Sequence, residues 1–275
     1  ITKNGMTFLK TKKFNSPKQI QILKILSNNK EPLKISNLKK YVSSPYIICK
    51  KLNDKGYVKI IKQTIISDPF NFMSPRYFKK IVLSSDQNNV FNKIKLNSHK
   101  FMPYLLHGVT GSGKTEIYLK LAEKIVQMDK SVLVLVPEIS LTPQIATRFR
   151  FSFGDKVALW HSHMSKSEKG WTWKKLKTGF YKIVIGARSA IFSPVKNLGL
   201  IIIDEEQEHS YKQESPAPRY NARDVAMIRG RYANAVVLLS SATPSLESYY
   251  NAIQKKFNLL KLTKRFGQSH YPKVS

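Results

Sequence analysis

The sequence contains a single cysteine, Cys49, among its 275 residues. One cysteine cannot form a disulfide framework or a cysteine-built zinc site, so both are excluded within these residues. The sequence also contains no apolar run near the roughly 20 residues of a membrane span, and residues 1–15 lack the hydrophobic core of a signal peptide. These absences predict a cytoplasmic protein with no zinc ion and no membrane partner.

Acidic residues are scarce as well. The chain has 47 Lys and Arg residues against 17 Asp and Glu residues, which gives a net charge of +30. Residues 1–80 hold 18 of these bases and three acids, a net charge of +15. A surface of this charge attracts polyanions and indicates a nucleic-acid partner, although it indicates no preference for a base sequence. An AT-rich genome would explain the choice of Lys over Arg, but it would not explain the shortage of acids.

One glycine-rich segment has the spacing of a phosphate-binding loop. The segment is Gly108-Val109-Thr110-Gly111-Ser112-Gly113-Lys114-Thr115. An apolar run at 104–106 precedes it and a helical pattern at 117–126 follows, which is the strand, loop and helix context of such loops. Its glycines let backbone N–H groups face phosphate oxygens. We predict that this segment binds ATP, with Lys114 on the β and γ phosphates and Thr115 on Mg²⁺. The alternative is a glycine turn beside a chance Lys-Thr pair.

Apolar runs recur after this loop, with helical patterns between them. The runs are residues 132–136, 183–185, 200–203 and 236–239. Near-continuous β-branched and leucine residues are typical of parallel strands that are buried on both faces. The sequence therefore predicts an α/β nucleotide-binding sheet with its chemistry at the carboxyl ends of the strands.

The run at 200–203 leads directly into Asp204-Glu205-Glu206-Gln207, which we call the acidic box. A carboxylate at a strand end can hold Mg²⁺, and its neighbour can orient the attacking water. We assign Asp204 to the metal and Glu205 to water activation, so that Lys114, Asp204 and Glu205 form the predicted catalytic set. A merely acidic surface patch is disfavoured because carboxylates are rare in this chain.

Other predicted strands end in residues that suit a phosphodiester backbone. These residues are Thr142, Arg188, Ser189, Ser241 and Thr243. The hydroxyls in 240–244 are also expected to hydrogen-bond the acidic box and relay the state of the phosphates. Upstream, Gln87 opens a predicted helix, and its amide can both donate to and accept from an adenine ring. The alternative for Gln87 is a solvated helix residue.

The first part of the chain predicts a small DNA-binding module. Three short helices at 17–26, 33–41 and 45–52, then a strand at 57–61, suggest a winged-helix domain over residues 16–62 that presents a basic helix to DNA. A generic three-helix accessory domain is the alternative. Residues 1–15 are expected to be a linker or a truncated end, and residues 63–82 a linker.

These motifs together resemble superfamily 2 helicases, and closely the replication-restart DNA helicases of the bacterial primosome. The resemblance rests on residues 108–116, 137–144, 186–192, 204–213, 219–224 and 240–245. It implies a RecA-like P-loop lobe at 83–260, preceded by the winged helix, and a connection to a second lobe that begins at 261–275. The sequence departs from the family pattern in two small ways. Gln207 stands where the family commonly has His, and the loop that follows lacks a Trp that the family often has there.

The resemblance also implies a function. The activity would be ATP-driven, Mg²⁺-dependent 3′-to-5′ unwinding of DNA, and a loop after the acidic box would couple DNA contact to ATP hydrolysis. The residues of that loop would be Tyr211, Lys212, Gln213, Arg219 and Tyr220. Expected partners are forked and single-stranded DNA, other primosome proteins and single-stranded DNA-binding protein, in the bacterial nucleoid.

The family's amino-terminal module, second lobe and zinc segment have no counterpart in these residues. We therefore expect a fragment that does not unwind DNA by itself. Two alternatives remain: a nucleotide- and DNA-binding remnant without catalysis, and a repair helicase of the same superfamily.

Overall fold

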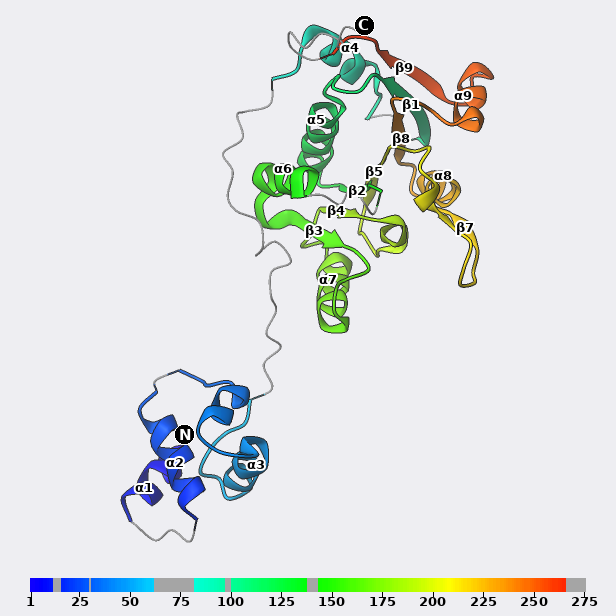
Figure 1. The fold of residues 1–275 in the computed structure, drawn as a ribbon. Coiled ribbons are helices and arrows are strands. Elements are labelled where there is room, and N and C mark those ends of the chain that lie inside the picture. Colours follow the sequence, from blue (N-terminus) through cyan, green and yellow to red (C-terminus); the bar gives the residue numbers. More distant parts are fainter. Residues whose placement is uncertain (12–15, 30, 62–81, 97–99, 138–142, 266–275) are drawn as a thin grey trace, which may run out of the picture. The chain divides into compact units, whose positions relative to one another are not determined.

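The computed structural model describes residues 1–11, 16–29, 31–61, 82–96, 100–137 and 143–265 (Figure 1). The chain divides into two compact units, residues 1–65 and residues 66–275. Each unit has its own hydrophobic core. The predicted linker at 63–82 falls almost entirely outside the described residues. None of the helices in the described part of the chain is long and apolar enough to cross a membrane.

Unit 1 is helical in its described residues. Its elements are α1 (Lys3–Lys10), α2 (Pro17–Ser27), the 3₁₀ helix η1 (Ile35–Lys40) and α3 (Pro45–Asp54). Both α2 and α3 begin at a proline that follows a serine, as predicted, because the fixed φ of proline suits the first turn of a helix. The second predicted helix forms as a 3₁₀ helix rather than an α-helix.

Two expectations for unit 1 are wrong. Residues 3–10 form a helix, so the linker half of the expectation (a linker or a truncated end) is wrong: Thr2 caps α1 by accepting from the Gly5 amide, and Phe8 stacks on Tyr57 with ring centroids 4.2 Å apart. Residues 57–61 form no strand, because the Tyr57 carbonyl accepts from the Thr2 amide (3.0 Å) and the Ile60 amide donates to a side chain. The winged-helix interpretation stays a prediction, since the described part of unit 1 contains the helices but no strand.

Unit 2 is built on a seven-stranded parallel sheet of order β3-β4-β2-β5-β8-β1-β9, which confirms the predicted α/β class. The strands are β1 (Met102–Gly108), β2 (Ser131–Leu135), β3 (Val157–Trp160), β4 (Ile183–Gly186), β5 (Leu198–Asp204), β8 (Val236–Ser241) and β9 (Asn258–Leu262). The helices are α4 (Ser85–Lys93), α5 (Lys114–Gln127), α6 (Pro143–Phe153), α7 (Lys166–Thr178), α8 (Ala222–Tyr232) and α9 (Leu246–Ile253), with 3₁₀ turns at Gly154–Lys156, Arg188–Phe192 and His209–Tyr211. A separate two-stranded hairpin joins β6 (Lys212–Gln213) to β7 (Tyr220–Asn221).

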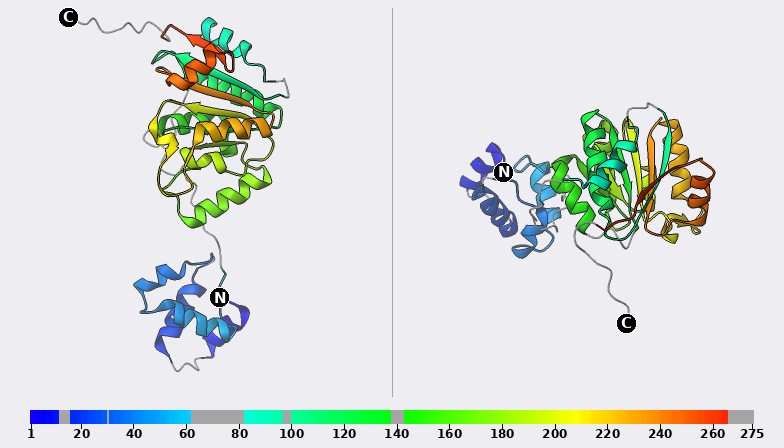
Figure 2. Two further views of the ribbon diagram at one scale, coloured as in Figure 1. Left: turned by 90° about the vertical axis from the view of Figure 1, so that its right-hand side faces the viewer. Right: turned by 90° about the horizontal axis from the view of Figure 1, so that it is seen from above.

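Helices cover both faces of this sheet (Figure 2). The core on one face contains α4, α5 and α6, and the core on the other contains α7, α8 and α9. Alternate residues of each strand enter opposite cores. In β5, for example, Ile202 belongs to the first core, whereas Ile201 and Ile203 belong to the second. This two-sided burial is why the strands are nearly continuous apolar runs.

The lobe extends beyond its predicted carboxyl boundary. Residues 258–262 pair with β1 as the edge strand β9, so residues 261 and 262 belong to the sheet and not to a connection. The opposite edge strand, β3, was also not predicted. Both β3 and β9 lie at an edge of the sheet. An edge strand pairs with only one neighbour, so it can form from a short apolar run or from apolar residues mixed with polar ones.

Candidate functional site

The phosphate-binding loop connects β1 to the first turn of α5. Gly111 and Gly113 adopt left-handed φ angles of 78° and 76°, which side chains rarely tolerate. Lys114 Nζ donates to the Gly108 carbonyl at 2.9 Å, and its stem lies so close that a Cβ on Gly108 would be 3.2 Å from it. The Ser112 hydroxyl is buried and, in the described part of the chain, has no hydrogen-bond partner. A cation and an unsatisfied hydroxyl in one glycine loop at the start of a helix fit a phosphate group.

Gln87 is only 1% exposed, so the alternative of a solvated residue is wrong. Its Oε1 accepts from the Ser84 amide (2.9 Å), which completes a capping box at the start of α4. Its Nε2 donates to the Ser112 carbonyl at 2.9 Å. Gln87 therefore fastens the phosphate-binding loop to α4, and a contact with adenine stays a prediction.

Asp204 ends β5 in a buried position beside the loop. The Tyr118 hydroxyl donates to Asp204 Oδ1 at 2.8 Å and lies 2.6 Å from Ser240 Oγ. Burial raises the pKa of the Asp204 carboxyl, and the hydrogen bond from Tyr118 opposes that shift. Mg²⁺ prefers oxygen ligands, which Asp204 and Thr115 both offer, and their binding of the metal stays a prediction. Tyr118 was missed because, in sequence, it is one more residue in the apolar pattern of α5.

Glu205 adopts a left-handed φ of 45°, which is rare for a residue with a side chain. Its Oε1 lies 3.8 Å from Lys114 Nζ, so the two predicted catalytic residues form an ion pair. Its Oε2 accepts from Gln207 Nε2 at 3.1 Å, and Gln207 Oε1 accepts from Ser241 Oγ at 2.5 Å. Ser241 in turn accepts from the amide of Thr243 (2.8 Å), whose side chain is exposed. The structure thus places Ser241 in contact with the acidic box, as predicted.

The segment after the acidic box brings together several of the predicted coupling residues. Arg188 donates to the Lys212 carbonyl at 2.7 Å, and its guanidinium lies 5.9 Å from the Tyr220 ring. Gln213 donates to the carbonyl of Pro218 at 3.0 Å, which closes the β6–β7 hairpin. These contacts make the hairpin a defined structure that is linked to the carboxyl end of β4.

The remaining predicted DNA residues differ in exposure. Ser189 and Arg219 are exposed, as a DNA contact requires, whereas Thr142 lies outside the described residues. Tyr211 is only 1% exposed, and its hydroxyl donates to the Asp204 carbonyl at 2.6 Å. The aromatic ring of Tyr211 therefore packs in the core and its hydroxyl holds the acidic box, and its place in a coupling loop stays a prediction.

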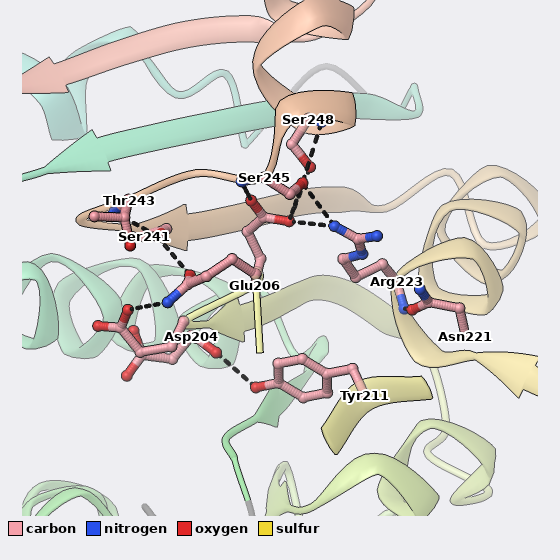
Figure 3. A network of polar contacts seen from close by, with 11 residues as sticks. Asp204, Glu206, Tyr211, Asn221, Arg223, Ser241, Thr243, Ser245 and Ser248 are labelled. Carbon is pink, nitrogen blue, oxygen red and sulfur yellow. Dashed lines mark hydrogen bonds and ion pairs between the residues drawn. The ribbon is translucent and has the colours of Figure 1, made fainter. Parts of the chain in front are cut away.

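Glu206 is the centre of a network that the sequence did not reveal (Figure 3). Its side chain is 0% exposed. Its carboxylate accepts from Arg223 Nη1 at 2.8 Å, the Ser245 amide at 2.7 Å and Ser248 Oγ at 2.8 Å. Arg223 also donates to Ser245 Oγ at 2.7 Å. A buried carboxylate needs such partners, because an unpaired charge in the protein interior is costly.

No group of three or more His, Cys, Asp or Glu side chains that could hold a metal ion occurs within the described ranges.

Comparisons with known proteins agree with this geometry. The family model for DEAD/DEAH box helicases matches residues 84–252. Replication restart protein PriA of Chlamydia muridarum is 42% identical over 269 residues, which cover 96% of this chain and 35% of that protein. Replication restart protein PriA of Bacillus subtilis is 44% identical over 262 residues, which cover 94% of this chain and 32% of that protein. The chain therefore spans about a third of the length of the curated relatives that it matches.

The fold also matches solved structures. A structure of RecG bound to a three-way DNA junction superposes with a TM-score of 0.53 and 24% identity, over 70% of this chain and 25% of that chain. Identity at this level shows a shared fold and nothing about substrate. The fold, the family model and the glycine loop beside the acidic box nevertheless agree on a helicase motor lobe.

Proposed function

Because the chain belongs to the DEAD/DEAH box helicase family and is similar to replication restart protein PriA over 96% of its length, we propose that it carries the first motor lobe of an ATP-dependent DNA helicase of replication restart. The observation that carries the proposal is the ion pair between Lys114 of the glycine loop and Glu205 of the acidic box, at 3.8 Å. In enzymes that transfer the terminal phosphate of a nucleotide to water, a lysine binds the phosphates and a nearby residue orients the attacking water.

Each residue of the site has a separate role in this proposal. Lys114 exchanges its contact with the Gly108 carbonyl for phosphate oxygens, and Thr115 and Asp204 hold Mg²⁺. Glu205 orients water and accepts its proton. When bound, Mg²⁺ supplies the positive charge that offsets the charge of the transferring phosphoryl group. Gln207 and Ser241 connect Glu205 to the end of β8, so a change at the phosphates can reach the segment 241–245.

DNA is the proposed partner of both units. The exposed lysines of α3 in unit 1 and the β6–β7 hairpin of unit 2 would contact its backbone, and movement along single strands would be 3′ to 5′. Other primosome proteins and single-stranded DNA-binding protein are proposed partners in the cytoplasm. These proposals are supported by the similarity to PriA and by the net charge of +30.

Replacing Lys114 by alanine is expected to weaken Mg²⁺–ATP binding by about 10- to 150-fold, since a charge-assisted hydrogen bond contributes about 1.5–3 kcal/mol. Isothermal titration calorimetry measures the affinity directly. Lys120→Ala is the matched control, because Lys120 lies on the same helix and pairs with the half-exposed Glu123. Equal ATP affinity in Lys114→Ala and wild type would refute the proposed function.

Binding of single-stranded DNA is expected to fall by roughly 10²- to 10⁴-fold between about 50 and 200 mM salt, because neutralised phosphates release counterions. Fluorescence anisotropy with two oligonucleotides of unrelated sequence should give similar values. Lys50→Ala and Lys51→Ala on α3 should each reduce the salt slope by about one, whereas Lys24→Ala on α2 serves as a control. An affinity independent of salt, or a strong preference for one sequence, would contradict the backbone-binding proposal.

A further inference from the structure

Consecutive carboxylates of the acidic box bind different partners. Glu205 contacts Lys114 and Gln207 at the nucleotide site, whereas Glu206 binds Arg223 in the protein interior. The chain adopts a left-handed φ of 45° at Glu205, where this division occurs. A residue with a side chain keeps such a conformation only where the surrounding structure holds it in place.

The contacts of Glu206 are suited to hold that turn. Its amide donates to the Ser240 carbonyl at 3.1 Å, which fixes its backbone to the end of β8. Its Oε1 accepts from the Ser245 amide at the start of α9, and its Oε2 accepts from Arg223 in the first turn of α8 (Figure 3). Glu206 therefore joins the acidic box to the first turns of two helices.

Arg223 also lies at the base of the segment proposed to contact DNA. That segment, residues 207–221, leaves the acidic box at Gln207 and returns at Asn221, which caps α8 by accepting from the Arg223 amide at 2.9 Å. Glu206 precedes this segment and Arg223 follows it, so the ion pair between them joins the two ends of the segment. On the other side of Glu205, Tyr211 from the same segment donates to the Asp204 carbonyl. Both neighbours of Glu205 are thus held by groups that belong to, or border on, residues 207–221.

We propose that Arg223 is a positioning residue that holds the turn at Glu205 through Glu206, and thereby couples DNA contact at residues 207–221 to the nucleotide site. Arg223 itself touches neither the proposed nucleotide nor the reacting atoms. The inference rests on the proposed function, since it requires that the chain bind both ATP and DNA. The inference assigns the coupling between ATP and DNA binding to the Glu206–Arg223 ion pair.

The test is the thermodynamic coupling between the two ligands in the full chain. The dissociation constant of a single-stranded oligonucleotide is measured with and without a saturating, non-hydrolysable ATP analogue and Mg²⁺. In wild type the analogue should change the constant by about fivefold or more, which is a typical coupling between two sites. In Arg223→Gln the ratio should fall below about twofold, because glutamine is shorter than arginine and carries no charge.

Two further variants separate coupling from folding. The double variant Glu206→Gln/Arg223→Gln removes the buried charge together with the ion pair, so it should fold and still show a ratio below about twofold. Arg223→Lys keeps the cation and should recover part of the ratio. Arg231→Gln on the same helix is the control and should match wild type. Loss of stability alone does not change the ratio, since both constants are measured on folded protein.

A wild-type ratio in the folded double variant would overturn the proposal. A ratio of one in wild type, with both ligands bound, would also overturn it while leaving the proposed function intact. Failure of wild type to bind ATP would instead refute the proposed function, and the coupling proposal with it.

Discussion

Joining residues 1–275 to a second motor lobe is expected to raise ATP hydrolysis by about 10³- to 10⁵-fold, which is the rate effect of an arginine finger and corresponds to about 4–7 kcal/mol of barrier. In unit 2, Lys114 of the glycine loop pairs with Glu205 at 3.8 Å, and Asp204 lies buried at the end of β5. Under the proposed function, hydrolysis would take place between two lobes, and the second lobe would supply the arginine. Residues 1–275 alone are therefore expected to bind ATP, to hydrolyse it slowly and to unwind no DNA.

Steady-state ATP hydrolysis in the presence of single-stranded DNA measures this effect. Glu205→Gln should lower the restored rate by about 10²- to 10⁴-fold, the range for a general base, with ATP affinity nearly unchanged. Glu123→Gln is the matched control, because Glu123 lies on α5, is half-exposed and pairs with Lys120. Fast, DNA-stimulated hydrolysis by monomeric residues 1–275 would show that the site is completed without a second lobe.

Replacing Arg223 by alanine is expected to lower the free energy of unfolding of unit 2 by about 3–5 kcal/mol, because it leaves the Glu206 carboxylate buried without its cation. The carboxylate is 0% exposed and cannot recover hydration in the folded state. Glu206→Gln/Arg223→Gln should lose much less, since a neutral amide costs less to bury than an unpaired charge.

Urea unfolding followed by tryptophan fluorescence tests this expectation for unit 2 alone, because all three tryptophans of the chain lie at positions 160, 171 and 173. Arg231→Ala is the control: Arg231 is exposed on the same helix and lies 5.6 Å from the Phe101 ring, so its removal should cost only about 0.5–1 kcal/mol. An equal loss in the single and double variants would show that the buried charge is not what makes Arg223 important.

The strands that could be predicted from the sequence are those buried on both faces. Residues 200–203 and 236–239 are apolar without interruption because each lies between two neighbours and two layers of helices. The edge strand β9 was missed, since Asn258 and Lys261 are exposed and interrupt the apolar pattern. The expected strand at 57–61 failed for the opposite reason: four of its five residues are apolar or aromatic, but the described part of unit 1 supplies no strand to pair with it.

The site shows a similar division. The glycine loop and the acidic box are local patterns, and their meeting at the carboxyl ends of β1 and β5 follows from a parallel sheet. The role of Glu206 could not be predicted, because its partners Arg223 and Ser245 are 17 and 39 residues away and nothing local indicates its burial. Tyr211 was placed in the coupling loop by the resemblance alone, and nothing local in the sequence indicates that its ring is buried and that its hydroxyl supports Asp204.

Amide hydrogen exchange over the whole chain, with and without Mg²⁺–ATP, tests the central claim most directly. The account predicts slower exchange on ATP addition at residues 109–115 and at the acidic box, 204–207, because phosphates accept from the loop amides and Mg²⁺ restrains the box. It predicts no change at α7, on the opposite side of the sheet from α5. Exchange that is unchanged at 109–115 under saturating ATP, or protection at α7 in its place, would contradict the account.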